Sequence, residues 1–217
     1  MLNLLRKEFK LAVNPFFYTL PFLTGALMLV PAWLYFLVTL YFCFITIPNM
    51  FGGFKSQNDL IFTSMLPVRK SDIVKAKIVF IVILELLHIG VASLYGLLSR
   101  HLYPHLIYFF YSPTAGFWGL SFVMLAIFNL IMFPMYYKTA YKFGPATLAS
   151  VTGAVAFAGI AEWLGVQNAV IHDLFKGAGA ANGLLQFALL LAGMAVFALC
   201  TLAAYKISVK RFEKVEM

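Results

Sequence analysis

Residues 14–54 contain no charged side chain, and this run of 41 positions constrains the fold more than any other feature. A helix needs about 20 apolar residues to cross the hydrocarbon core of a bilayer. Similar runs recur along the 217-residue chain, in which 63% of the residues are hydrophobic and 11% are charged. Because the runs are apolar on every face, they predict membrane-spanning helices rather than the alternating strands of a transmembrane barrel.

The first run is too long for one span, so we divide it at Pro31. Proline has no backbone N–H and a fixed φ, and both are tolerated better in a turn between two helices than inside a helix. The predicted architecture is all-α, with a single transmembrane domain over residues 1–217. Six spans are expected, at residues 16–30, 32–53, 78–98, 117–137, 145–164 and 184–205. The longest polar interruption, the loop at 55–77, lies between the second and third spans.

Basic residues are distributed unevenly among the segments that join these spans. Placing the N-terminus in the cytoplasm leaves only Arg100 and Lys176 outside, so 14 of the 16 Lys and Arg residues lie inside. Cytoplasmic loops of membrane proteins carry such an excess of basic residues. The pattern therefore predicts a multi-pass protein of the cytoplasmic membrane with both termini inside. It also explains the net charge of +8 without a nucleic-acid partner.

The first thirteen residues combine apolar and basic side chains at helical spacing. Leu2, Leu5 and Phe9 share one face, and Lys7 lies among the basic residues on the other side. The pattern predicts an amphipathic helix that lies on an anionic leaflet. The alternative, the charged start of a signal peptide, is disfavoured by Glu8 and by the lack of a small-x-small cleavage site before the next hydrophobic run.

Motifs for catalysis are missing from the sequence. It contains no G-x-x-x-x-G-K-[ST] phosphate loop, no H-E-x-x-H and no G-x-S-x-G. Only eight residues are acidic, and both cysteines, Cys43 and Cys200, fall inside predicted spans. We therefore predict a chain that is not an enzyme and that holds no metal or cofactor of its own.

Two ionisable residues interrupt the third predicted span. Glu85 and His88 are three residues apart and therefore share a helix face, and a charge in a bilayer usually faces a partner or a wet cavity. Three alternatives stay open: a structural pair bonded to each other or to a neighbouring helix, the lining of a transport path or subunit seam, and proton coupling. Asn129, in the fourth span, is a further candidate for such a path or seam.

The 55–77 loop contains a short amphipathic pattern. Asn58 or Asp59 can cap a helix that Pro67 ends. Its apolar positions fit one face, with Phe62 beside it: Leu60, Ile61, Met65 and Leu66. Such a helix suits a groove on a soluble partner. The alternative is a helix that rests on lipid headgroups.

Residues 64–78, S-M-L-P-V-R-K-S-D-I-V-K-A-K-I, resemble the signature S-L-P-v-s-R-x-x-i-V-x-x-K of type-2 ABC exporter membrane subunits. In those permeases the signature also lies between the second and third spans. The layout is similar too, with an N-terminal amphipathic elbow helix, six spans and no nucleotide site. The chain looks closest to small bacterial permeases that export membrane-active peptides such as phenol-soluble modulins or bacteriocins.

The resemblance implies a permease subunit that moves an amphipathic peptide outward, coupled through the 58–66 helix to a separate ATPase subunit that holds ATP and Mg. It implies two permease copies, as a homodimer or with a related permease, and a hairpin at 165–183 that re-enters the membrane. The coupling residues would be Asn58, Asp59, Leu60, Ile61, Phe62, Met65, Leu66, Pro67, Arg69 and Lys70. The competing class is a non-ABC membrane protein, an intramembrane enzyme or assembly factor with a lipid-bound loop.

Overall fold

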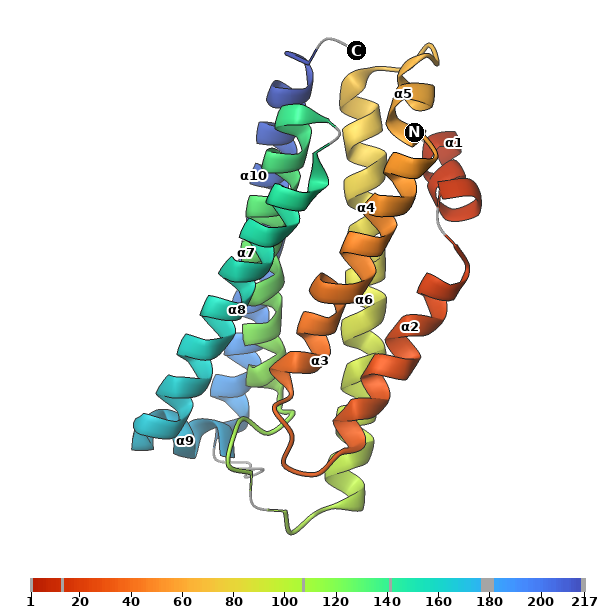
Figure 1. The fold of residues 1–217 in the computed structure, drawn as a ribbon. Coiled ribbons are helices and arrows are strands. Elements are labelled where there is room, and N and C mark those ends of the chain that lie inside the picture. Colours follow the sequence, from red (N-terminus) through yellow and green to blue (C-terminus); the bar gives the residue numbers. More distant parts are fainter. Residues whose placement is uncertain (1, 13, 107, 141, 177–181, 216–217) are drawn as a thin grey trace.

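The computed structural model describes residues 2–12, 14–106, 108–140, 142–176 and 182–215. Most of these residues are helical, and none of them forms a strand (Figure 1). The longer apolar segments are α2 (Phe16–Gly25) with the 3₁₀ turn η2 (Ala26–Leu29), α3 (Phe36–Tyr41), the π-helical η3 (Phe42–Thr46), α4 (Ile47–Ser56), α6 (Lys70–Leu102), α7 (Ala115–Thr139), α8 (Phe143–Gln167) and α10 (Gly183–Phe212). Short helices are α1 (Leu2–Lys7), η1 (Glu8–Ala12), α5 (Asp59–Ser64) and α9 (Ala169–Lys176).

Among the described residues, five helices are long and apolar enough to cross a membrane. They are Phe36–Ser56, Lys70–Leu102, Ala115–Thr139, Phe143–Gln167 and Gly183–Phe212, and Phe16–Leu29 is a shorter apolar helix. The predicted all-α, multi-pass membrane class is therefore confirmed. The first of the six predicted spans coincides with the shorter helix.

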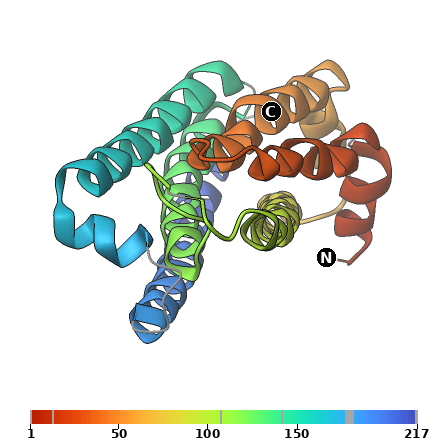
Figure 2. The same cartoon turned by 90° about the horizontal axis from the view of Figure 1, so that it is seen from below.

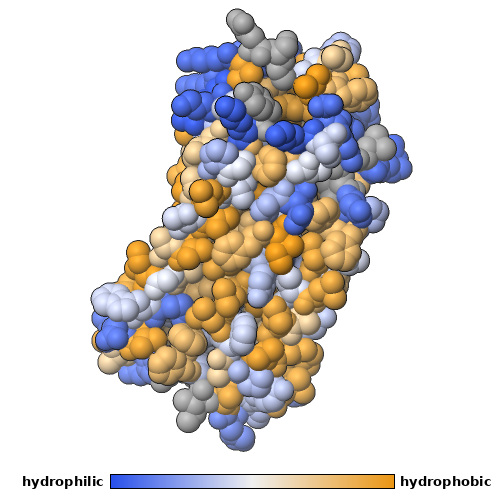
Figure 3. Space-filling model, in the orientation of Figure 1, coloured by the Kyte–Doolittle hydropathy of each residue, from blue (hydrophilic) through white to orange (hydrophobic). Residues whose placement is uncertain are grey.

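The spans form an elongated bundle whose two ends differ in polarity. One end, called the α5 end here, carries α1, α5 and the last turns of α10 (Figure 1). The opposite end carries α9 and the turn that joins α2 to α3. Hydrophilic side chains gather at the α5 end, whereas the middle of the visible face is largely hydrophobic (Figure 3). This distribution suits a bundle whose middle lies in lipid.

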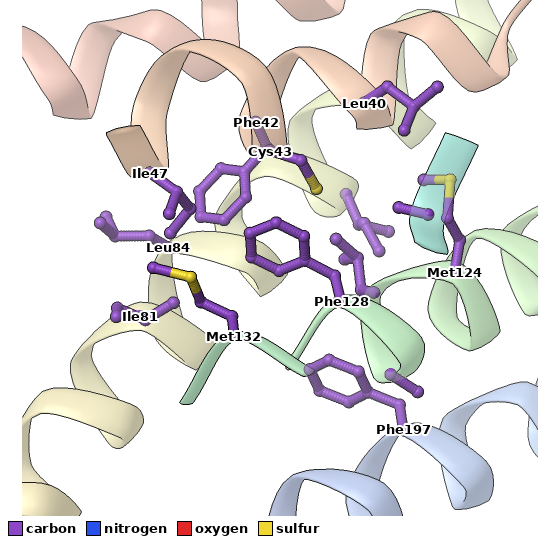
Figure 4. Packing of buried hydrophobic residues seen from close by; sticks show 14 of the residues in the cluster. Leu40, Phe42, Cys43, Ile47, Ile81, Leu84, Met124, Phe128, Met132 and Phe197 are labelled. Atoms are coloured by element: carbon purple, nitrogen blue, oxygen red, sulfur yellow. The ribbon is translucent and has the colours of Figure 1, made fainter. Parts of the chain in front are cut away.

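The core lies where α3, η3, α4, α6 and α7 meet. Phe42, Phe128 and Met132 point toward one another there, with Leu84 and Ile81 of α6 beside them (Figure 4). The helices α8 and α10 stand at the periphery when the bundle is viewed along its length (Figure 2). They are also the least buried of the five long helices.

The backbones of α7 and α10 approach each other closely at two glycines. A Cβ added at Gly193 would lie 2.7 Å from the Cα of Gly119, and one added at Gly119 would lie 3.0 Å from the Cα of Leu190. Small residues allow helix backbones to come this near in a membrane. By contrast, a Cβ at Gly159 of α8 meets nothing within 4 Å.

Gly193→Ala is therefore expected to force α7 and α10 apart and to lower stability by roughly 1–3 kcal/mol, the usual effect of overpacking. Thermal unfolding in detergent micelles measures this change. The control is Gly159→Ala, whose added methyl group enters open space and should change stability by less than about 0.5 kcal/mol. Equal melting temperatures for the two variants would contradict the close contact.

Candidate coupling site

The α5 helix lies outside the bundle at the α5 end and carries side chains on two distinct faces. Asn58 stands at its N-cap position with φ 50° and ψ 32°, a left-handed conformation that Asn tolerates better than most residues. The Asn58 side chain makes no capping hydrogen bond. The helix ends at Ser64, shortly before Pro67.

The outer face of α5 is apolar and exposed. Ile61 is 50% exposed and Phe62 60%, and just past the end of the helix Met65 is 78% exposed and Leu66 is exposed as well. The prediction that Leu60 shares this face is wrong, because Leu60 is only 7% exposed and packs in the core cluster. Phe62, expected beside the face, is instead a main part of it.

The inner face of α5 joins a buried cluster of four charges: Lys7, Glu8, Asp59 and Lys77. Lys77 Nζ lies 2.5 Å from Asp59 Oδ2 and 3.3 Å from Glu8 Oε2. Lys7 Nζ lies 3.1 Å from Glu8 Oε1 and also pairs with Asp59. The four side chains are between 2% and 14% exposed. Two cations and two anions therefore alternate around one closed, nearly dry ring.

Neighbouring groups complete the cluster. Lys7 Nζ donates to Thr63 Oγ1 at 2.7 Å, and the Lys77 ammonium lies 3.5 Å from the centre of the Phe54 ring. Burial opposes ionisation of Asp59, but the ammonium groups of Lys77 and Lys7 outweigh it and lower the pKa of that carboxyl. Burial likewise opposes the charge on Lys7, and Glu8 and Asp59 outweigh it and raise the Lys7 pKa. The ion pairs therefore favour the charged forms of Asp59 and Lys7.

The cluster connects three segments that are far apart in the sequence. Lys7 and Glu8 come from the N-terminal helical segment, Asp59 comes from α5, and Lys77 comes from the second turn of α6. A displacement of α5 must therefore move α6 or break buried ion pairs. The arrangement therefore links the position of α5 to that of a membrane-spanning helix.

A second contact fixes the start of α6. Lys70 Nζ donates to the carbonyl of Val215 at 2.8 Å and lies 5.5 Å from the centre of the Phe212 ring. Lys70 therefore ties α6 to the end of α10 and does not point freely toward a partner. Arg69, directly before it, has an extended backbone and an exposed side chain, and Pro67 is also exposed.

Glu85, His88 and Asn129 are fully buried at mid-span and take partners on neighbouring helices. Asn129 Nδ2 donates to Glu85 Oε2 at 2.9 Å and lies 3.4 Å from Thr201 Oγ1. His88 Nε2 lies 2.8 Å from the carbonyl oxygen of Val38. Glu85 and His88 thus bind different neighbouring helices and not each other. This fits the alternative in which both residues have a structural role through bonds to neighbouring helices. The contacts of Glu85 and Asn129 also link α6 to α7 and α10.

The predicted coupling residues fall into three groups in the structure. An exposed group could meet a partner, and it consists of Asn58, Ile61, Phe62, Met65, Leu66, Pro67 and Arg69. Asp59 and Leu60 are buried, and Lys70 binds α10.

The parts played by Lys7, Glu8 and Lys77 differ from those that the sequence predicts. Local spacing places Lys7 on a headgroup-facing side and Lys77 in a basic loop, whereas both are buried in the cluster. One signal was available: Lys77, Ile81 and Leu84 recur at helical spacing, so Lys77 lies on the apolar face of α6. A lone charge on such a face requires a buried partner.

Fold and site together define a multi-pass helical membrane protein with an anchored, partly apolar helix at its charged end. Residues 3–213 match the family model described as ABC-2 family transporter protein. The chain belongs to this family and is a membrane permease subunit of an ABC transporter, a class that works with an ABC ATPase partner. Neither a curated protein nor a solved structure has significant similarity to the chain.

Lys77→Met is expected to lower stability by about 3 kcal/mol, because removing one member of a buried ion pair leaves uncompensated charges. Adding Asp59→Asn should recover at least about 1 kcal/mol of that loss, since the two residues are in direct contact. Thermal unfolding measures both effects. Lys55→Met, at an exposed lysine of α4, is the matched control. Additive losses in the double variant would contradict a coupled cluster.

Proposed function

We propose that α5 is the helix by which this permease docks on the nucleotide-binding subunit of an ATP-driven exporter. The observation that carries the proposal is the division of α5 into an exposed apolar face and a face anchored by buried ion pairs. A helix that transmits force needs both properties. The partner would supply ATP and Mg, for which the present sequence has no phosphate loop.

The α5 end is the cytoplasmic end in this proposal. Its support is the excess of basic residues in the segments that meet there, including the 55–77 loop and the C-terminal tail. Both termini and α5 then face the ATPase, and the membrane is the cytoplasmic membrane of the cell. The N-terminal segment would act as an elbow helix at the headgroups, with Lys7 and Glu8 turned inward.

An apolar face at a charged end favours a protein partner over a headgroup-bound helix. Phe62 is 60% exposed and Met65 78%. The end of the bundle that carries α5 is the one where hydrophilic side chains gather (Figure 3). Apolar side chains grouped inside a polar rim are typical of protein interfaces. Arg69, beside this face, can supply part of the rim.

Phe62→Glu and Met65→Glu are each expected to weaken binding of the ATPase subunit by about tenfold or more, because each places a charge in a desolvated contact. Co-purification from detergent, followed by a titration of the two purified subunits, measures the loss. Coupled ATP hydrolysis should fall in parallel.

The control for this experiment is Lys210→Glu, which adds an acid on the exposed surface of α10 at the same end of the bundle. It should bind the ATPase like the unmodified chain. Leu60→Glu is unsuitable because Leu60 is buried and its replacement would disturb folding. Normal binding and hydrolysis in both Phe62→Glu and Met65→Glu would refute α5 as the docking helix.

We further propose that the substrate is an amphipathic peptide moved outward by two permease copies, as a homodimer or with a related permease. This part rests on the resemblance of residues 64–78 and of the overall layout to type-2 ABC exporters, among which the chain looks closest to small peptide-exporting permeases. The peripheral position of α8, with its exposed apolar side chains, leaves surface available for a second permease. Glu85, His88 and Asn129 are enclosed within one chain, so a part in the path would require the helices around them to separate.

An amphipathic helical peptide is expected to raise the ATP hydrolysis rate of the permease–ATPase complex in proteoliposomes. A peptide of the same composition with a scrambled, non-amphipathic order should not, because only the first presents a continuous apolar face to the bilayer. Uptake of labelled peptide into inside-out vesicles is the second measurement. Equal stimulation by both peptides would contradict the proposed substrate class and would leave the docking assignment untouched.

A further inference from the structure

A groove of about 610 Å³ runs along the outside of the bundle between α6 and α10. One wall is α6 from Lys75 to Leu86, the other is α10 from Met194 to Tyr205, and Phe122 of α7 contributes to the lining. Except for Lys75, Thr201 and the Tyr205 hydroxyl, the lining side chains are apolar.

The groove covers one half of the membrane. Lys75 and Leu86 are eleven residues apart, which corresponds to about 16 Å along a helix. This is roughly half of the 30 Å hydrocarbon core. The antiparallel α10 wall, from Tyr205 to Met194, has the same length and begins at the same α5 end. The groove therefore matches the acyl region of the leaflet next to the α5 end.

A free positive charge stands at the polar end of the groove. Lys75 is exposed and, among the described residues, takes part in no hydrogen bond or ion pair, even with Asp72 one turn earlier. Lys77, two residues later, is neutralised by Asp59 and Glu8. Lys206 is also exposed, next to Tyr205 on the opposite wall.

The shape and charge favour a lipid over a second copy of this chain. Suppose that two copies met at this groove and were related by an axis along the membrane normal. Their Lys75 side chains would then lie at the same depth on either side of the contact, and the two positive charges would repel each other. An anionic phospholipid instead places its phosphate at the charge and its chain along the apolar walls. Leu86 is 45% exposed and Leu202 57% exposed, so both walls can contact an acyl chain.

We propose that the groove is a binding site for an anionic phospholipid, with one acyl chain between α6 and α10 and the phosphate at Lys75. The lipid would come from the cytoplasmic leaflet in the proposed orientation. Thr201 lines the groove and is also the α10 partner of Asn129, which binds Glu85. A bound acyl chain would therefore help to set the distance between α6 and α10, next to the buried polar contact that runs from Glu85 through Asn129 to Thr201.

Native mass spectrometry of the purified full chain tests the site with phosphatidylglycerol and phosphatidylcholine of identical acyl chains. The unmodified chain should retain phosphatidylglycerol about fivefold better, since one lysine near a surface contributes roughly 1 kcal/mol. Lys75→Gln should remove this preference while retaining lipid. Val82→Trp should fill the groove and reduce retention of both lipids. Ile160→Trp, on the exposed face of α8, is the control and should change neither.

Three results would overturn the site: an undiminished phosphatidylglycerol preference in Lys75→Gln, unchanged retention in Val82→Trp, or efficient disulfide cross-linking of Leu202→Cys between two chains in native membranes. The last result would show that a second copy covers the groove. Leu202→Trp fills the groove from the α10 wall and gives an independent test if Val82→Trp does not fold. ATPase binding is measured separately, so failure of this site and failure of the docking proposal are distinguishable.

Discussion

The buried ring of Lys7, Glu8, Asp59 and Lys77 is the interaction on which the α5 end of this permease depends. Each ion would be strongly disfavoured alone in such a dry environment, so the four must be buried together or not at all. This requirement fixes the N-terminal segment, α5 and the start of α6 relative to one another. Apolar packing alone is less directional and would allow α5 to slide along the bundle.

The same constraint explains why α5 can expose a large apolar face. A six-residue helix has little stability of its own, and its outer side chains contribute nothing to the chain's core. Asp59 and Leu60 hold it from the inner side, one through charge and one through packing. Ile61, Phe62 and Met65 are thereby left available for a partner without loss of the helix.

Hydropathy and charge predicted the helical class, the approximate helix positions and the loop that contains α5. They succeeded because a bilayer imposes length and polarity rules that each segment must satisfy by itself. The inward turn of Leu60, the partners of Lys7 and Lys77, and the link from Glu85 to Asn129 could not be predicted in this way. Each depends on which helix lies opposite, and local spacing carries no information about that neighbour.

The polar contacts along α6 form a series that begins at α5 and ends at mid-span. Lys77 holds α5, Lys70 holds the end of α10, and Glu85 reaches α10 again through Asn129 and Thr201. All of these contacts are made by one continuous 33-residue helix, α6, or by its partners. In the proposed coupling, a push on α5 would therefore act on the spacing of α6 and α10 at two levels, and the proposed lipid groove lies between these same two helices.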